Sequence, residues 1–260
     1  AGTDKVTGND GADIIALASA NDNVRTTIVY TANTDGAAAN TVTGHDVITN
    51  LDLNAGNATD DIISDLANLD FEDDIGESRK LETAEQLSIL QQLLVAGNAT
   101  TAHTITEAFY LLISNPDQME LVVNDHSLIP NMVEEALRLL TPTNNMWRIA
   151  TEDTELEGVT IPKGSVILIR YGSGNRDEDL FENPDKFDVT RKNARRHIAF
   201  GQGIHVCLGM NLARKEMYTA FPIILDRLKN MRFSEGNEFI YSPNVLLRGL
   251  DNLYIEFDKV

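Results

Sequence analysis

The sequence predicts a mainly α-helical protein with small β-sheets, preceded by a short acidic segment that is β-rich or disordered. From Thr59 onward, apolar residues recur every three or four positions over long stretches, which is the period of an amphipathic helix. Residues 1–58 differ: they are rich in Asp, Asn, Thr, Gly and Ala, and short β-branched runs alternate with turn residues. We therefore expect two regions, an acidic one over 1–58 and a helical one over 59–260.

The overall charge excludes some classes of partner. The chain has 260 residues, with 40 Asp and Glu against 21 Lys and Arg, and a formal net charge of −19. Nucleic acids and anionic membranes carry the same sign, so we expect neither as a partner. No apolar run approaches the roughly 20 residues that span a bilayer. The single cysteine excludes an internal disulfide, which suits a reducing compartment, and we expect a cytoplasmic location.

The acidic region contains one stretch with a possible ligand. "GNDGADII" (Gly8–Ile15) approximates the repeated nonapeptide of calcium-binding β-rolls, with Asn9 at the second glycine position, and it weakly resembles the margin of a repeat-in-toxin domain. Carboxylate and carbonyl oxygens suit calcium. Such rolls stack many turns, however, and here one copy stands alone. A calcium site and a plain acidic segment both remain open.

Three helices are expected before residue 142. The stretch "DDIISDLANL" places four apolar residues on one face: Ile62, Ile63, Leu66 and Leu69. A long helix should run from residue 83 until Pro116 stops it, with an interruption at "AGNATT" (96–101), which is poor helix material. A third helix should cover 129–140, where Glu135 and Arg138 lie three apart on one face.

Beyond residue 142, strands are expected to alternate with irregular chain. Residues 158–172 predict a hairpin that turns at Pro162-Lys163-Gly164. An irregular stretch follows, then a final helix over about 208–228. The tail, residues 246–257, predicts a closing pair of strands.

The only cysteine lies in "FGQGIHVCLG" (Phe200–Gly209), just before the final helix. Gly201 and Gly203 permit turn conformations and a close approach of the backbone to a flat ligand. At a helix N-terminus, backbone N–H groups and the helix dipole stabilise a thiolate. Cys207 is therefore a candidate nucleophile or soft metal ligand.

The residues alone leave several roles for Cys207. A cysteine hydrolase needs an oriented histidine base, and His205 is not placed by spacing to serve as one. A zinc or iron–sulfur site needs several cysteines. One thiolate suffices for a metal whose other ligands come from elsewhere, as from a porphyrin. A buried cysteine acting as a small apolar side chain is equally open.

"FGQGIHVCLG" resembles the haem-binding loop of cytochromes P450, F-G-x-G-x-H-x-C-x-G, at every fixed position. "EALR" (135–138) is similar to the family's E-x-x-R, "PDKFDVTR" (184–191) to the segment that completes that network, and "AGNATT" to its oxygen-binding groove. The resemblance covers about Thr59 to Val260 and is strongest to soluble bacterial members. It implies the C-terminal half of a cytochrome P450 fold, with haem b between the long helix and the cysteine loop.

The resemblance also implies roles for individual residues. Cys207 would be the axial thiolate of the haem iron, and Phe200 would pack near the sulfur. Arg148 and His205 would pair with the haem propionates. Thr100 would hydrogen-bond dioxygen and help deliver protons. The remaining assignments are a structural charge network (Glu135, Arg138, Arg191) and substrate-facing positions (Leu93, Leu94, Ala96, Asn145, Val245).

The sequence departs from the family pattern in two places. Ala99 occupies the position before the threonine that usually carries an acid. In addition, the N-terminal half of a P450 has no counterpart in residues 1–58, so we expect the chain to be a fragment, a fusion or a degenerate product.

Three functional hypotheses follow. The first is a haem-thiolate monooxygenase, or its C-terminal part, that inserts one atom of dioxygen into a small apolar organic substrate. Its electrons would come from a ferredoxin or flavoprotein reductase. The basic run Arg191–Arg196 is a candidate docking patch for that partner, and a solvated loop is an equally open interpretation of the run. The second is a truncated haem-binding pseudoenzyme. The third is a non-enzymatic, calcium-binding acidic module with a vestigial P450 portion.

Overall fold

The computed structural model describes residues 62–72, 76, 78–241 and 243–259, together with the backbone of two short strands. These strands, β1 (Ile14–Ala16) and β2 (Ile28–Tyr30), pair antiparallel. The predicted calcium-binding stretch, 8–15, lies outside the described residues apart from the backbone of its last two positions.

The chain divides into two compact units, and helix α2 (Thr83–Ser114) crosses from one to the other. The smaller unit, residues 35–98, contains α1 (Ile62–Asn68) and an antiparallel pair of strands, β3 (Asp70–Glu72) and β4 (Ser78–Lys80). Arg79 of β4 binds Glu85 of α2 through two hydrogen bonds of 2.7 and 2.8 Å, which fixes the strand pair against the start of that helix.

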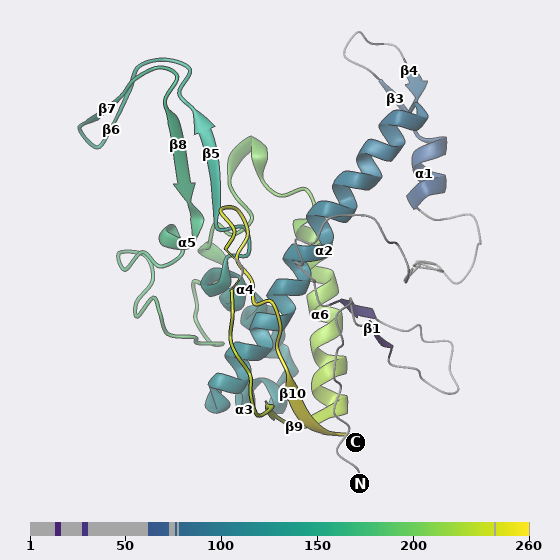
Figure 1. Ribbon diagram of the computed structural model, residues 1–260, viewed down its shortest axis with the longest axis vertical. Helices are drawn as coiled ribbons and strands as arrows, with labels where there is room; N and C mark the ends of the chain where they lie inside the picture. The colour runs from purple at the N-terminus through teal and green to yellow at the C-terminus, as the bar shows by residue number, and fades with distance from the viewer. Residues whose placement is uncertain are drawn as a thin grey trace. The chain divides into compact units, whose positions relative to one another are not determined.

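The larger unit combines residues 1–34 with 99–260 and contains the remaining elements. Its helices are α3 (Pro116–Asn124), α4 (Ile129–Leu140), the short α5 (Tyr171–Gly174) and α6 (Met210–Arg227). Its strands are β5 (Asn145–Ile149), β6 (Thr154–Leu156), β7 (Val159–Ile161), β8 (Val166–Arg170), β9 (Leu228–Phe233) and β10 (Ile255–Lys259). The prediction of a mainly helical chain with small sheets is confirmed (Figure 1).

The predicted interruption of the long helix is wrong, because "AGNATT" is helical in α2. Residues 101–105 of that helix are buried, and Thr104 Oγ1 donates a 2.8 Å hydrogen bond to the Thr100 carbonyl within it. Tertiary packing commonly outweighs an intrinsic propensity penalty of about 1 kcal/mol per residue. As predicted, the helix ends just before Pro116, which begins α3.

The core of the larger unit lies among helices. Buried apolar side chains from the second half of α2, from α3, α4 and α6, and from the loop before α6 form one cluster, in which the rings of Phe109 and Phe221 lie 5.1 Å apart. Helix α4 is buried along almost its whole length. It ends at Thr141, whose φ is +46° and whose hydroxyl donates a hydrogen bond to the Arg138 carbonyl. Pro142 then prevents continuation of the helix.

The predicted hairpin over 158–172 is wrong in its pairing. A turn does form at the predicted place, where Gly164 has a φ of +83° and Ser165 N donates to the Pro162 carbonyl. The strands on either side of it pair elsewhere: β7 with β6, and β8 with β5 (Figure 1). A local turn signal specifies the change of direction and leaves the partner strand undetermined.

The predicted closing strand pair over 246–257 is also wrong. Strand β10 lies in this tail, but its partner is β9, directly after α6. Sequence reasoning missed β9 because the strand follows α6 directly, with no turn residue between them to mark a boundary. Strand β10 therefore pairs with the segment that directly follows α6.

Replacement of Phe221 tests the core. The Phe221→Ala substitution removes a fully buried ring and its contact with Phe109, so we expect a loss of about 3–5 kcal/mol in the free energy of unfolding, measured by urea denaturation. Leu212→Ala, on the exposed face of the same helix, is the control and should cost far less. Equal losses at the two positions would contradict this assignment of the core.

Candidate functional site

The cysteine loop, Phe200–Gly209, is a tight irregular turn that ends where α6 begins. Gly201 and Gly203 both have φ of +72°, a conformation that side-chain-bearing residues rarely adopt. Residues 203–205 form a 3₁₀ turn, and Cys207 N donates a 2.9 Å hydrogen bond to the Phe200 carbonyl. Helix α6 starts three residues after the cysteine, as the sequence predicted to within two residues.

The loop presents its cysteine and its apolar side chains to the outside. Cys207 is a free, exposed thiol, so its interpretation as a small buried apolar residue is wrong. Ile204 and Leu208 are 96% and 101% exposed, and Val206 is exposed as well. Exposed apolar side chains on both sides of a thiol can pack against a flat apolar group whose metal binds sulfur.

The donor set around the thiol is consistent with such a group. Among the described residues, no cluster of three His, Cys, Asp or Glu side chains could hold a metal ion. A metal held by Cys207 without further ligands from these residues would bring its other ligands with it, as iron does in a porphyrin. The residues present fit a thiolate-ligated haem better than a protein-only metal site.

The two predicted propionate partners lie on different elements. Arg148 is half-buried on β5, opposite Ile167 of β8, and its Nη1 donates to the Trp147 carbonyl at 2.9 Å. His205 is exposed at the end of the 3₁₀ turn in the cysteine loop. Within the part of the chain that the structure describes, no hydrogen bond joins them. A shared role toward one ligand remains a prediction.

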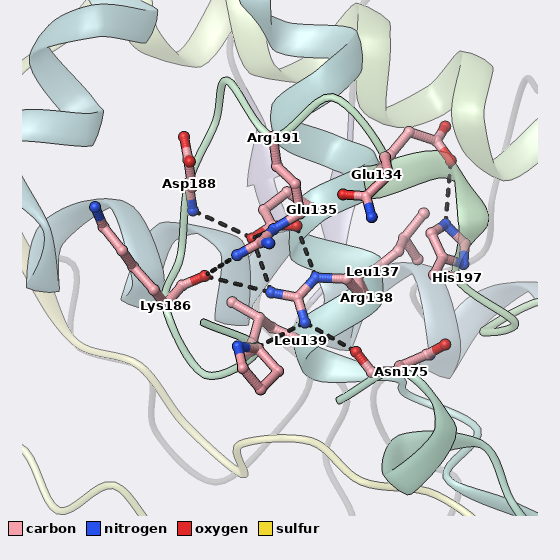
Figure 2. Close-up of polar contacts among 12 residues, drawn as sticks. Glu134, Glu135, Leu137, Arg138, Leu139, Asn175, Lys186, Asp188, Arg191 and His197 are labelled. Carbon is pink, nitrogen blue, oxygen red and sulfur yellow. Dashed lines mark hydrogen bonds and ion pairs between the residues drawn. The ribbon is translucent and has the colours of Figure 1, made fainter. Parts of the chain in front are cut away.

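The predicted charge network is assembled between α4 and the irregular chain that follows β8 (Figure 2). Glu135 of α4 accepts two hydrogen bonds from Arg138, Nε to Oε2 at 2.8 Å and Nη2 to Oε1 at 2.9 Å. Arg191 Nε adds a third at 2.9 Å, and the backbone N–H of Asp188 a fourth at 3.2 Å. Glu135 and Arg138 are fully buried, which their spacing on a helix did not reveal.

The arginines of this network also bind the irregular chain around it. Arg138 donates to three backbone carbonyls, those of Asn175, Pro184 and Lys186, so that all five of its N–H groups are used (Figure 2). Arg191 donates to the carbonyls of residues 182, 183 and 186. The Glu135 carboxylate, through these two arginines, thereby fixes the irregular segment between β8 and the cysteine loop.

A second buried network, centred on Glu134, was missed by sequence reasoning. Arg214 of α6 donates to both Glu134 oxygens at 2.7 and 2.8 Å, and the Tyr218 hydroxyl donates to Oε1 at 2.8 Å. His197 Nε2 lies 3.1 Å from Oε2 (Figure 2). The partners follow Glu134 by 63 to 84 residues, and no local spacing connects them.

These contacts keep Glu134 charged. Burial alone raises the pKa of a carboxyl, but the hydrogen bonds from His197, Arg214 and Tyr218 outweigh it and lower the pKa of Glu134 to about 2. The hydrogen bond to Glu134 in turn raises the pKa of Arg214. A permanent ion pair therefore joins α4 to the first turns of α6.

The second network reaches the cysteine loop through an aromatic ring. The Arg214 guanidinium lies 4.9 Å from the centroid of the Phe200 ring, a cation–π distance. The His197 ring lies 5.9 Å from the same ring. Phe200 also packs partly buried against the core. The first residue of the loop is thus held by both charge and apolar contacts.

The predicted oxygen-site and substrate residues occupy α2, β5 and the C-terminal segment. Thr100 is half-buried on α2, next to Ala99. Asn145 Nδ2 donates a 2.7 Å hydrogen bond to the Val245 carbonyl, so the structure brings those two residues together. The other three predicted substrate-facing residues belong to the smaller unit, on the first half of α2, where they are exposed: Leu93, Leu94 and Ala96.

Glu107 is a third fully buried glutamate, and it is less well satisfied than the other two. Its Oε1 accepts from Arg248 Nη1 at 3.3 Å, while its Oε2 is buried without a hydrogen-bond partner. Burial raises the pKa of Glu107 to about 7, against the opposing effects of the nearby Tyr241 hydroxyl and the charge of Arg248. One isolated acidic residue in an apolar helix pattern was the only sequence signal.

The fold and the loop define a mainly helical protein with an exposed thiol just before the start of α6. Comparisons with known proteins give the same class. Residues 48–248 match the cytochrome P450 family. The chain belongs to that family, whose cofactor is haem.

Individual relatives are bacterial P450s. The chain is 38% identical over 200 residues to 6-deoxyerythronolide B hydroxylase of Saccharopolyspora erythraea, covering 76% of this chain and 48% of that protein. It is 34% identical to steroid C26-monooxygenase of Mycobacterium tuberculosis, covering 76% and 52%. The structure of CYP109Q5 from Chondromyces apiculatus superposes with a TM-score of 0.70 at 36% identity, covering 77% of this chain and 50% of that one. The chain therefore spans about half the length of the relatives it matches. No described helix is long and apolar enough to cross a membrane.

We expect the buried ion pair between Glu135 and Arg138 to contribute strongly to the free energy of unfolding. Arg138→Met leaves Glu135 without its two-point partner and leaves three carbonyls without donors, so we expect a loss of about 3–5 kcal/mol in the free energy of unfolding. Arg232→Met removes a partly exposed pair with Glu256 and should cost about 0–1 kcal/mol. Chemical denaturation of both variants checks this. A small effect at Arg138 would contradict it.

Glu107 should make stability depend on pH. Its pKa in the folded protein, about 7, exceeds its ordinary value of 4.5, so its contribution is most favourable below pH 4.5 and is lost as the pH rises through 7. Unfolding free energy measured from pH 4.5 to 8 should fall more steeply in the wild type than in Glu107→Gln. Parallel curves for the two proteins would show that Glu107 does not titrate in this range.

Proposed function

We propose that this chain serves as the haem-binding part of a monooxygenase that inserts one atom of dioxygen into a small apolar organic substrate. The observation that carries the proposal is the exposed Cys207 thiol, presented by a glycine loop between exposed apolar side chains at the start of α6. Membership in the P450 family and monooxygenase relatives support the reaction type.

The residues of the loop and of β5 are proposed to hold the haem. Cys207 would supply the axial thiolate, and Phe200 would pack close to the sulfur. Arg148 and His205 would neutralise the propionates, for which arginine is well suited because its guanidinium binds carboxylates at two points. The haem iron, when bound through a thiolate, supplies the oxygen-activating chemistry.

Thr100 is the proposed residue for handling protons beside the oxygen. Its hydroxyl can donate one hydrogen bond and accept another, which lets it hold a proton for transfer. Its neighbour Ala99 cannot pass a proton on, because alanine has no titratable group. Protons would therefore reach Thr100 from water or from a group elsewhere in the chain.

Substrate contact is proposed for five residues whose side chains are mostly apolar: Leu93, Leu94, Ala96, Asn145 and Val245. Apolar side chains suit an apolar organic molecule, and the amide of Asn145 can orient such a molecule through a hydrogen bond. We keep the proposed division at residue 58, between an acidic segment and the P450 portion. The relatives are cytochromes P450 and give no support to a calcium site.

Electrons are proposed to come from a ferredoxin or a flavoprotein reductase. Arg191, the first residue of the basic run at 191–196, is buried where it binds Glu135, so it does not contribute to a surface patch. Lys192, Arg195 and Arg196 are exposed and form the basic surface that an acidic partner would meet.

The absorbance spectrum of the haem-supplied chain, reduced and exposed to carbon monoxide, tests the proposal. We expect a Soret band at about 450 nm, the position typical of thiolate-ligated haem. Cys207→Ser keeps the shape of the side chain but removes the sulfur, so the band should disappear.

The matched control is the stability of Cys207→Ser. Because Cys207 is exposed, its unfolding free energy should equal that of the wild type, which separates loss of the ligand from loss of the fold. A wild-type chain without the band, or a Cys207→Ser variant that keeps it, would overturn the proposal.

A further inference from the structure

Arg214 lies between a buried carboxylate and the cysteine loop. On one side its Nε and Nη2 bind the two oxygens of Glu134, which is fully buried. On the other side its guanidinium lies over the ring of Phe200, the first residue of the loop. The arginine itself is only about one-fifth exposed, so its position is fixed from two directions.

Arg214 is also the member of this network with an electrostatic link to the sulfur. The charge of Cys207 contributes to the raised pKa of Arg214, after the larger effect of the Glu134 hydrogen bond. The guanidinium of the ion pair lies over Phe200, the first residue of the cysteine loop, while its other contacts are with the two oxygens of Glu134.

We propose that Glu134 and Arg214 form a positioning pair that holds Phe200 and sets the charge beside the Cys207 thiolate. The inference rests on the proposed function, because it concerns the thiolate as a ligand of haem iron. Arg214 acts through its charge and through Phe200, and it is therefore a positioning residue.

The chemistry requires both members of the pair. A guanidinium binds a carboxylate at two points and stacks on an aromatic face at the same time, which an ammonium group cannot do. Three other polar side chains surround the pair: Tyr218 of α6, His197 before the loop, and Arg195, which interacts with the Tyr218 hydroxyl. His197 also connects Glu134 to Phe200, through a ring contact at 5.9 Å, whereas Arg214 is the side chain in cation–π contact with Phe200 among the described residues.

The proposed charge effect has a definite sign. Reduction of a thiolate-ligated haem adds one negative charge next to Cys207. A nearby positive charge favours the reduced state, and a nearby negative charge disfavours it. Loss of Arg214 should therefore lower the reduction potential, whereas loss of the Glu134 charge should raise it.

The experiment is a spectroelectrochemical titration of the haem-loaded chain. For Arg214→Gln we expect the ferrous-to-ferric ratio at a fixed potential to fall about threefold, which is about 28 mV for a one-electron couple at about 59 mV per tenfold change. For Glu134→Gln we expect the ratio to rise. Arg214→Lys keeps the charge and should stay near the wild-type potential.

Opposite shifts of the reduction potential in Arg214→Gln and Glu134→Gln are the diagnostic result. A purely structural role would shift the potential in the same direction in both variants. Arg232→Gln, in an ion pair with Glu256 on β9 and β10, is the control and should not shift the potential. If Arg214→Gln does not retain haem, the other two variants decide the question. Arg214→Lys should then stay near the wild-type potential, and Glu134→Gln should raise it.

The outcomes separate the two proposals. A band at about 450 nm with potentials that are unchanged, or that shift in one direction in both variants, overturns the positioning pair and leaves the proposed function standing. Absence of that band in the wild type overturns the proposed function, and the positioning pair with it.

Discussion

The arrangement of the larger unit depends on two adjacent carboxylates that are buried side by side on one helix. Glu134 and Glu135 of α4 are both fully buried, and burying an ionised carboxylate costs several kcal/mol unless it is paired and hydrogen-bonded. Neighbouring helical residues point about 100° apart, so the two carboxylates need partners on different sides. Glu135 takes its partners from α4 itself and from the meander that follows β8. Glu134 takes its partners from residue 197 and from α6. Each requirement for neutralisation therefore fixes a different segment against α4.

The cysteine loop lies between these two fixed segments. It has little regular structure and exposes its apolar side chains, so its own contacts cannot hold it rigidly. The irregular segment before it accepts hydrogen bonds, through its backbone carbonyls, from Arg138 and Arg191, the two arginines that bind Glu135. The helix after it, α6, binds Glu134 through Arg214. Phe200 joins the loop to the core and to the Arg214 guanidinium. The proposed metal ligand, Cys207, can thus lie on an exposed loop, because the charge networks on both sides hold the segments that flank it.

The contrast among the three buried glutamates follows from the number of their hydrogen bonds. Glu134 and Glu135 each accept from several donors, whereas Glu107 has one long contact with Arg248 and one oxygen without a partner. A carboxylate that is incompletely satisfied binds a proton more readily, which is why burial dominates at Glu107 and hydrogen bonds dominate at Glu134. Glu107 lies two turns beyond Thr100 on α2, so the same helix carries the proposed proton-handling residue and a group that titrates near neutral pH.

The sequence by itself determined the helices, the position of the cysteine at a helix start, and the family motifs, because these depend on local periodicity, on turn residues and on short spacings. It placed the turn at Pro162–Gly164 and the end of α2 before Pro116 for the same reason. Only the tertiary structure decided which strands pair, since β5 joins β8 and β9 joins β10 across long stretches of chain. It also decided that the Glu135–Arg138 pair is buried, and that Glu134 meets Arg214, 80 residues away. Burial and distant charge pairing are properties of packing, and no spacing along one chain encodes them.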